Sequence, residues 1–263
     1  MAYPVILIHG MSCTGANLKR VASLMTQRGY KCLAPTLPAH DASPDQPLQV
    51  GRQSLRDYLT FLEQIVATRE DRCPPIIIGH SMGGLLAQQL AARVQPLALV
   101  LLTPAAPYGI NGLSLTNIGA VLDWMSNGAF WRKAYKPGFA RAQRYAFRGL
   151  LTDRHHALYE GMVHESGRAI FEICLWPLDF SRAAAVDAQR IRCPVYIVSC
   201  GEDWLAPAAV VGKLARLYPQ ATHRHYPARG HWVIDDEDTD EMVHSICGWL
   251  QPIEQKQERS GHV

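Results

Sequence analysis

Residues 75–92 read PIIIGHSMGGLLAQQLAA, a short apolar run followed by a glycine-rich turn and a helix-forming stretch. The turn holds the pattern G-x-S-x-G from Gly79 to Gly83, with Ser81 at its centre. A sharp strand-to-helix turn forces such a serine into a strained backbone conformation with an exposed hydroxyl, and the glycines let neighbouring segments approach closely. Ser81 is therefore the candidate nucleophile. The alternative is a glycine-rich turn of a doubly wound protein that carries no chemistry.

Strands and helices alternate on both sides of this turn. Apolar runs predict strands at 5–8, 31–34, 76–78, 98–102, 195–199 and 223–226. Helical spacing predicts helices at 16–28, 50–68, directly after Ser81, at 207–217 and at 237–250. The alternation and the nearly continuous apolar strands predict an α/β fold with a mostly parallel, doubly wound sheet that is covered on both faces.

The alternation stops between Pro107 and about Arg182, where aromatic and basic residues follow helix-like spacing. We expect a core of residues 1–106 and 183–250, a helical lid of residues 107–182 inserted after the strand at 98–102, and a frayed polar tail at 251–263. A pocket between lid and sheet must be lined by some of the aromatic side chains. The expected substrate-binding residues are Trp124, Trp131, Trp204 and Trp232.

Composition narrows the class of protein. With 263 residues, 48% of them hydrophobic, we expect one compact domain. The net charge of +3 is too small for a nucleic-acid partner. The N-terminal segment has no basic region like that of a signal peptide, and no apolar run approaches the roughly 18 residues that span a bilayer. The seven cysteines form no C-x-x-C pair, which suits reduced thiols, and we expect a soluble, cytoplasmic protein.

A serine hydroxyl needs a positioned base, and the base needs an acid that fixes its tautomer. Asp203 follows the strand at 195–199 and His231 follows the strand at 223–226, so both are expected in loops at the carboxyl ends of strands. The order Ser, Asp, His is the one that accompanies the G-x-S-x-G turn. The candidate catalytic residues are therefore Ser81, Asp203 and His231.

Each of these residues has a plainer alternative. Asp203 could cap the helix that starts near Pro207, and its neighbour Glu202 could replace it, although Glu202 is expected to point to the opposite side of the turn. His231 could be a packed loop histidine. For the oxyanion hole, the backbone N–H groups of Met11, after His9-Gly10, and of Met82 are the candidates.

With these motifs the chain resembles the α/β-hydrolase superfamily, as a serine esterase-like or lipase-like member with an inserted lid. The resemblance extends over residues 4–250 and implies a sheet of eight strands or slightly fewer, without the usual leading hairpin. The short N-terminus is similar to the plant methylesterase and hydroxynitrile lyase branch. The lyases have a threonine and a lysine at the positions of Gly10 and Trp232. The epoxide hydrolases and haloalkane dehalogenases use an aspartate at the position of Ser81.

The resulting functional hypothesis is hydrolysis of a carboxylic ester with a hydrophobic acyl or aryl group through an acyl-enzyme. This chemistry needs no metal and no cofactor. The same triad acting on a thioester, lactone, amide or carbon–carbon bond is an alternative, and so is a ligand receptor built on the hydrolase fold. The partner is expected to be a small hydrophobic ester, and the oligomeric state stays open.

Three polar features have mainly structural explanations. The basic residues between Trp124 and Thr152 could attract an anionic substrate or a membrane, but a solvated helix face is the simpler interpretation; they are Arg132, Lys133, Lys136, Arg141, Arg144 and Arg148. His223 and His225 share a strand face without a third metal ligand. Residues 165–168 are expected at the surface, with a contact to the site from above as the alternative.

Overall fold

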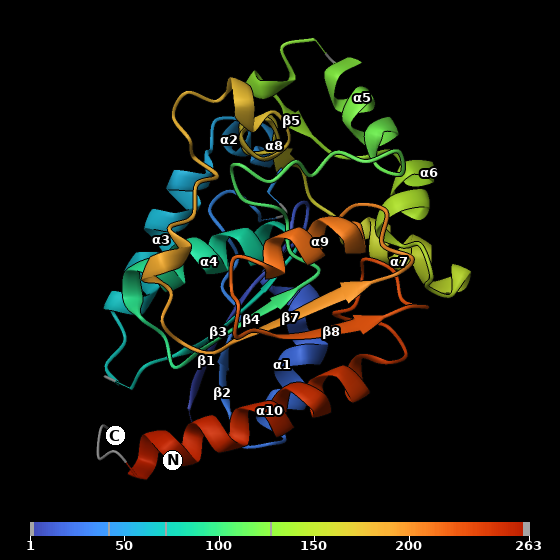
Figure 1. Ribbon diagram of the computed structural model, residues 1–263. Coiled ribbons are helices and arrows are strands. Elements are labelled where there is room, and N and C mark those ends of the chain that lie inside the picture. The colour runs from blue at the N-terminus through green and yellow to red at the C-terminus, as the bar shows by residue number, and fades with distance from the viewer. Residues whose placement is uncertain (1–2, 42, 72, 127, 260–263) are drawn as a thin grey trace.

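A parallel sheet forms the centre of the molecule (Figure 1), whose computed structural model describes residues 3–41, 43–71, 73–126 and 128–259. Its six strands lie in the order β2-β1-β3-β4-β7-β8, and every neighbouring pair is parallel. The strands are β1 (Pro4–Ile8), β2 (Lys31–Leu33), β3 (Ile76–His80), β4 (Ala98–Leu102), β7 (Val195–Cys200) and β8 (Thr222–Tyr226). The predicted mostly parallel, doubly wound α/β sheet is confirmed.

Burial explains which runs became inner strands. Every residue of β1, β3, β4 and β7 is buried, as expected for apolar strands covered on both faces. The edge strands β2 and β8 have no fully buried residue. The pattern of apolar residues is therefore strongest at the centre of the sheet, beside the turn that carries Ser81.

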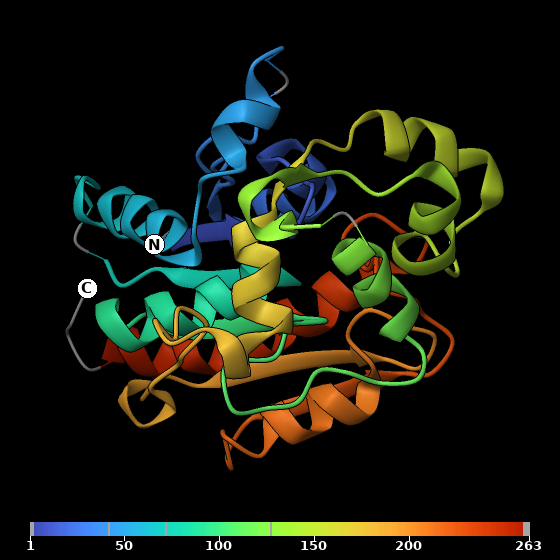
Figure 2. The same cartoon turned by 90° about the horizontal axis from the view of Figure 1, so that it is seen from above.

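Helices cover both faces of the sheet (Figure 2). One face packs against α1 (Lys19–Thr26), which follows a helical turn at Gly15–Leu18, and against α10 (Thr239–Arg259). The other face packs against α3 (Leu55–Ala67), α4 (Met82–Val94) and α9 (Ala208–Ala215), with the short α2 (Gln46–Val50) before α3. Helix α3 starts later than expected because Ser54 caps it: its Oγ accepts from the Arg56 amide, and its own amide donates to Asp57.

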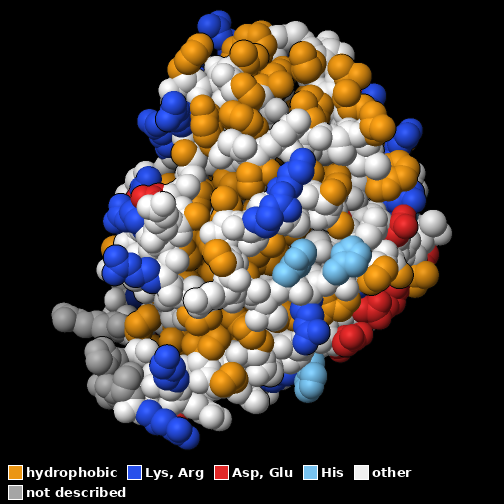
Figure 3. All heavy atoms as spheres, in the orientation of Figure 1, with side chains coloured by type: hydrophobic (Ala, Val, Ile, Leu, Met, Phe, Trp, Pro, Cys, Tyr) orange, Lys and Arg blue, Asp and Glu red, His pale blue; other side chains and the backbone are white. Residues whose placement is uncertain are grey.

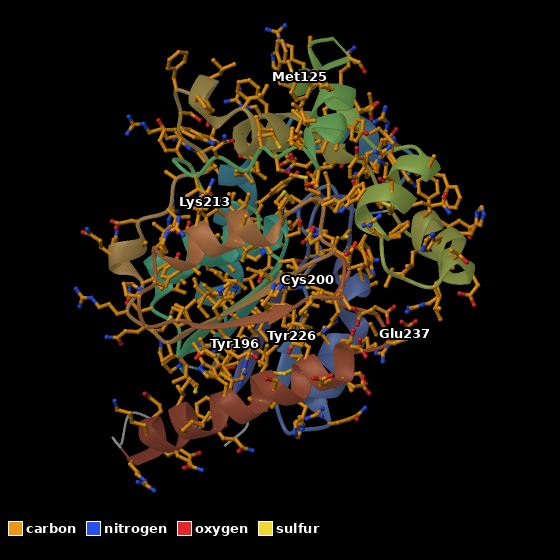
Figure 4. The ribbon with its side chains drawn as sticks, turned by 45° about the vertical axis from the view of Figure 1, so that its right-hand side comes forward. Met125, Tyr196, Cys200, Lys213, Tyr226 and Glu237 are labelled. Carbon is orange, nitrogen blue, oxygen red and sulfur yellow. The ribbon has the colours of Figure 1, made fainter. Side chains whose placement is uncertain are left out.

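The expected frayed tail is wrong as far as Arg259, because α10 continues that far. Ile253 packs against the hydrophobic core, and the Tyr3 hydroxyl donates to the Glu254 carbonyl. In the first half of α10, Ser245 bonds the hydroxyl of Tyr196, which reaches from β7 towards the helix (Figure 4). These contacts stabilise the helical conformation of the polar segment. Residues 260–263 lie outside the described part of the chain.

The segment between β4 and β7 consists of short elements. They are α5 (Ile118–Ser126), β5 (Ala134–Tyr135), α6 (Phe139–Arg141), α7 (His155–Glu160), β6 (Glu165–Ser166) and α8 (Gly167–Cys174), with helical turns at Phe130–Arg132, Ala142–Ala146, Thr152–Arg154, Trp176–Leu178 and Ala188–Arg190. Strands β5 and β6 pair antiparallel. We call residues 107–182 the insert. Most of the large exposed apolar side chains lie on it, at the top of the space-filling view (Figure 3).

Candidate active site

Ser81 occupies a strained turn between β3 and α4. Its φ of 55° and ψ of −121° lie outside the regions that L-residues favour, a conformation that costs on the order of 1–3 kcal/mol. The turn is held because the Ser81 amide donates to Leu102 and its carbonyl accepts from Ala105. Gly83 packs so tightly on β1 that a Cβ there would lie 2.2 Å from the Ile8 carbonyl oxygen. The local sequence thus fixes the serine at the carboxyl end of the central strand.

The structure brings the three sequence-predicted side chains together. His231 Nε2 lies 2.9 Å from Ser81 Oγ, and His231 Nδ1 lies 2.8 Å from Asp203 Oδ2. Asp203 and His231 are 2% and 3% exposed, so solvent hardly screens their interaction. The arrangement is a continuous hydrogen-bonded chain from carboxylate to imidazole to hydroxyl.

Asp203 faces His231 and does not cap the following helix, because the N-cap of α9 is Pro207 and no described side chain caps it. Its Oδ1 accepts hydrogen bonds from the amides of Leu205 and Ala206, both at 2.8 Å, while Oδ2 faces His231. Glu202 points elsewhere and forms an ion pair with Arg148 at 2.8 Å. The neighbouring acid is therefore not placed to replace Asp203.

The backbone of His231 is held by the last residue of β3 and by the residue that follows β4. Its carbonyl oxygen accepts hydrogen bonds from His80 Nε2 at 2.9 Å and from Thr103 Oγ1 at 3.2 Å. Beyond it, a buried ion pair between Arg229 and Asp236, with N–O distances of 2.8 and 2.6 Å, braces the loop. The backbone at His231 is thus fixed by contacts that do not involve the imidazole ring.

His80 and His9 are buried neutral histidines. Burial lowers the pKa of each to about 3, so neither is charged at pH 7. Since His80 Nε2 donates to the His231 carbonyl, its proton is on Nε2. His9 accepts from the Leu37 amide through Nε2 and donates to the Gly10 carbonyl through Nδ1.

We expect His80 to make the fold sensitive to acid. A histidine whose pKa is lowered in the folded state gives stability above its unfolded pKa of about 6.5, and this stability is lost as the pH falls towards the folded value. At pH 5 the loss is about 2 kcal/mol for such a group. The test compares the free energies of unfolding in urea at pH 7 and pH 5. Between these two pH values, His80→Gln should lose about 2 kcal/mol less of this free energy than the wild type does. An unchanged pH dependence would show that His80 is not buried neutral.

The two expected oxyanion donors belong to segments next to Ser81. Met82 is the first residue of α4, and Met11 follows β1 after Gly10, where a Cβ would lie 2.9 Å from Ser81 Cβ. Among the described residues, no hydrogen bond occupies the amide of Met11 or Met82. Both amides are therefore available to an oxygen atom beside Ser81.

A mostly apolar cavity of about 150 Å³ opens at Ser81 and His231, between the strand ends and the insert. Of the four tryptophans expected in it, Trp124 and Trp232 line the cavity. Trp131 does not, because it is 41% exposed and packs against Phe130 and Phe171 on the outer side. Nor does Trp204, whose ring is covered by the Arg148 guanidinium, 3.9 Å from its centroid.

Some basic residues of the insert have specific partners, although four of the six are exposed, as expected for a solvated face: Arg132, Lys133, Arg141 and Arg144. Arg141 lines the cavity and pairs with Asp123 at 2.9 Å, Arg148 pairs with Glu202, and Lys136 donates to the Met162 carbonyl. These partners weaken the alternative that the basic residues attract an anionic substrate or a membrane.

Glu165 lies in an environment that its sequence context does not predict. Glu165 and Ser166 are fully buried rather than at the surface, and Glu165 lines the cavity, as the alternative had it. Its carboxylate meets His40 Nε2 at 3.0 Å and the Tyr58 hydroxyl at 2.9 Å. Partners more than 100 residues away along the chain leave no local signal.

No metal site is apparent in the part of the chain that the structure describes, where no three His, Cys, Asp or Glu side chains are placed to hold an ion. His223 and His225 lie on the edge strand β8, and both contact Ser199 Oγ, at 2.8 and 3.0 Å. All seven cysteines are free. Among the described helices, none combines the length and the apolar character that crossing a membrane requires.

A parallel sheet with a strained serine after its central strand, and an acid and a histidine in loops at the strand ends, defines the class of α/β-hydrolase-fold proteins. The chain belongs to the alpha/beta hydrolase family, whose model matches residues 5–244. The resemblance found in the sequence is thereby confirmed.

Several known proteins are similar over almost the whole chain. The Magnesium-chelatase 30 kDa subunit of Rhodobacter capsulatus is 26% identical over 262 residues, covering 94% of this chain and 86% of that protein. A pimeloyl-[acyl-carrier protein] methyl ester esterase of Chromobacterium violaceum is 27% identical over 245 residues, covering 86% of each. The crystal structure of a methylesterase from Arabidopsis superposes with a TM-score of 0.73 at 12% identity, covering 95% of this chain and 99% of that one. The likeness to esterases supports a hydrolase.

Proposed function

We propose that the protein is a serine hydrolase that cleaves carboxylic esters of small hydrophobic acyl or aryl groups. The observation that carries this proposal is the chain of hydrogen bonds from Asp203 through His231 to Ser81, at 2.8 and 2.9 Å. The esterase relative is consistent with it. The free cysteines support the cytoplasm as its location.

The reaction would proceed through an acyl-enzyme. As Ser81 Oγ attacks the ester carbonyl, its proton passes to His231 Nε2, and Asp203 stabilises the imidazolium that forms. The amides of Met11 and Met82 would hold the oxyanion. His231 then returns the proton to the leaving alcohol, and water, deprotonated by His231, releases the acid.

The insert, residues 107–182, would act as the lid that selects the substrate. A cavity of about 150 Å³ is small beside those that take drug-sized ligands, and a cavity of that order holds a benzene-sized group. Its walls include Trp124, Ile170 and Trp232. This supports a short or single-ring group beside the scissile carbonyl.

The test is covalent labelling with a fluorophosphonate probe, read as intact mass, followed by a series of p-nitrophenyl esters of increasing acyl length. We expect one probe per chain and many turnovers on the shorter esters. Labelling with turnover confined to a thioester, lactone or amide would keep the triad and change the bond. Ligand binding that raises the melting temperature without turnover would favour a receptor on the same fold.

Trp124 is expected to limit acyl length. Its side chain borders both the main cavity and a neighbouring cavity of about 70 Å³. Trp124→Ala should open one into the other and raise the ratio of kcat/KM for octanoate over acetate esters about tenfold, since one methylene in an apolar pocket is worth about 1 kcal/mol or more. Trp131→Ala, outside the cavity, is the matched control. A ratio that shifts equally in both variants would remove Trp124 from the specificity pocket.

A further inference from the structure

Ser12 follows Met11 in the same turn, and the insert makes hydrogen bonds to both its amide and its carbonyl group. The Ser12 amide donates to Glu165 Oε2 at 3.3 Å, and the Ser12 carbonyl accepts from the Val163 amide at 3.0 Å. Ser12 has a φ of 56°, in the left-handed region that a residue with a Cβ rarely adopts. This conformation persists only where surrounding contacts impose it, and here they come from a segment about 150 residues away.

The carboxylate of Glu165 is itself rigidly held. Oε1 accepts from the Tyr58 hydroxyl at 2.9 Å and from the Ser166 amide at 2.8 Å, while Oε2 accepts from Ser12 and lies 3.0 Å from His40 Nε2. Gln46 adds bonds to the carbonyl and the amide of His164, on the same segment. The acceptor that faces Ser12 therefore has a fixed position.

His40 keeps this carboxylate charged. Burial alone would raise the pKa of Glu165, but the adjacent His40 holds it below its usual value. Burial alone would likewise lower the pKa of His40, and the Glu165 carboxylate raises it instead. The two form a buried ion pair that adds little net charge beside the reaction cavity. An apolar pair would pack there at lower desolvation cost, so the pair is not explained by stability alone.

We propose that Glu165 is a positioning residue: by accepting the Ser12 amide, it fixes the Met11–Ser12 turn so that the Met11 N–H points at the developing oxyanion. The inference rests on the proposed function of Met11. It follows that the insert does more than shape the pocket, because one of its buried side chains completes the catalytic geometry. The Met11–Ser12 turn is then oriented for catalysis only when residues 163–165 are packed on the core.

Two substitutions separate the hydrogen bond from the charge. Glu165→Asp keeps the charge beside His40 but withdraws the carboxylate from Ser12 by one methylene. Glu165→Gln removes the charge but leaves an oxygen that still accepts from Ser12. We expect Glu165→Asp to lower kcat by about 10- to 100-fold with KM within about threefold, because displacement of an oxyanion donor acts on the transition state. Glu165→Gln should lose less.

Inhibition separates this effect from general damage. The Ki of a trifluoromethyl ketone, which forms an oxyanion on Ser81, should rise in proportion to the loss of kcat/KM in Glu165→Asp. The Ki of the corresponding alcohol, which forms none, should stay within about threefold. Arg132→Ala, at an exposed residue of the insert that does not line the cavity, is the control and should keep kcat within about threefold. Assays at low temperature keep a destabilised variant folded.

Hydrogen exchange tests the same contact without catalysis. The peptide that contains Met11 to Cys13 should exchange faster in Glu165→Asp than in the wild type and in Arg132→Ala. If the wild type had no esterase activity but Glu165→Asp still exchanged faster at this peptide, the positioning role of Glu165 would stand and the proposed function would be refuted. Unchanged exchange, a larger kinetic loss in Glu165→Gln than in Glu165→Asp, or an equal loss of kcat in Arg132→Ala would each overturn the role of Glu165.

Discussion

Ser81→Ala is expected to lower the turnover of every ester that the wild type hydrolyses by about 10⁴-fold or more, because the bond-forming atom is lost and the remaining groups act as a unit with it. The fluorophosphonate label should disappear as well. The Ser81 hydroxyl bonds only to His231 among the described residues, so the melting temperature should change little. Initial rates and intact mass, measured on the same preparation, check both outcomes.

Two thiols in the same cavity provide the control. Cys13 and Cys174 line it, and burial raises the pKa of each to about 12, which keeps them protonated and unreactive at neutral pH. Cys174→Ser should therefore label and turn over like the wild type. If Ser81→Ala kept its label or its activity, the nucleophile would be another residue, and the proposed mechanism would fail.

Asp203→Asn is expected to lower kcat by about 10⁴-fold while the fold is kept. The amide oxygen can still accept from Leu205 and Ala206, as Asp203 Oδ1 does. The amide nitrogen would then face His231 Nδ1 as a donor. This favours the tautomer with its proton on Nε2, which cannot take the proton of Ser81.

Glu202→Gln is the matched control, because it removes the neighbouring carboxylate, which pairs with Arg148 at the surface. Its kcat should stay within about threefold of the wild type. Steady-state rates of the two variants, with circular dichroism to verify folding, decide the assignment. Equal losses would mean that the loop as a whole matters, and a loss confined to Glu202→Gln would make Glu202 the orienting acid.

The fold class could be predicted from the sequence because the patterns that indicate it are local. Four strands that are buried on both faces must be apolar throughout, so their positions stand out in the chain. The G-x-S-x-G turn combines glycines that avoid backbone clashes with a serine between strand and helix, all within five residues. Asp203 and His231 followed from the rule that parallel strands gather their carboxyl ends at one edge of the sheet.

Errors arose where a residue's environment comes from distant segments. The tail after Leu250 looks polar, but α10 extends over it because Ile253 and Glu254 meet Tyr3 and the core. Trp131 and Trp204 are aromatic residues of the kind that line pockets, but both lie outside the cavity. Trp131 packs against Phe171, and Arg148 covers the ring of Trp204. Composition identifies aromatic side chains without giving the direction in which each points.

The sequence by itself determined the sheet, the serine turn and the order of the acid and the base, since these depend on periodicity, on glycine at close approaches and on strand direction. Only the tertiary structure decided what surrounds Ser81 and His231. Glu165 reads as a surface residue of the insert, and it becomes a buried partner of Ser12, His40 and Tyr58 only when these segments meet. The energy that determines its burial comes from hydrogen bonds between residues that no local pattern connects.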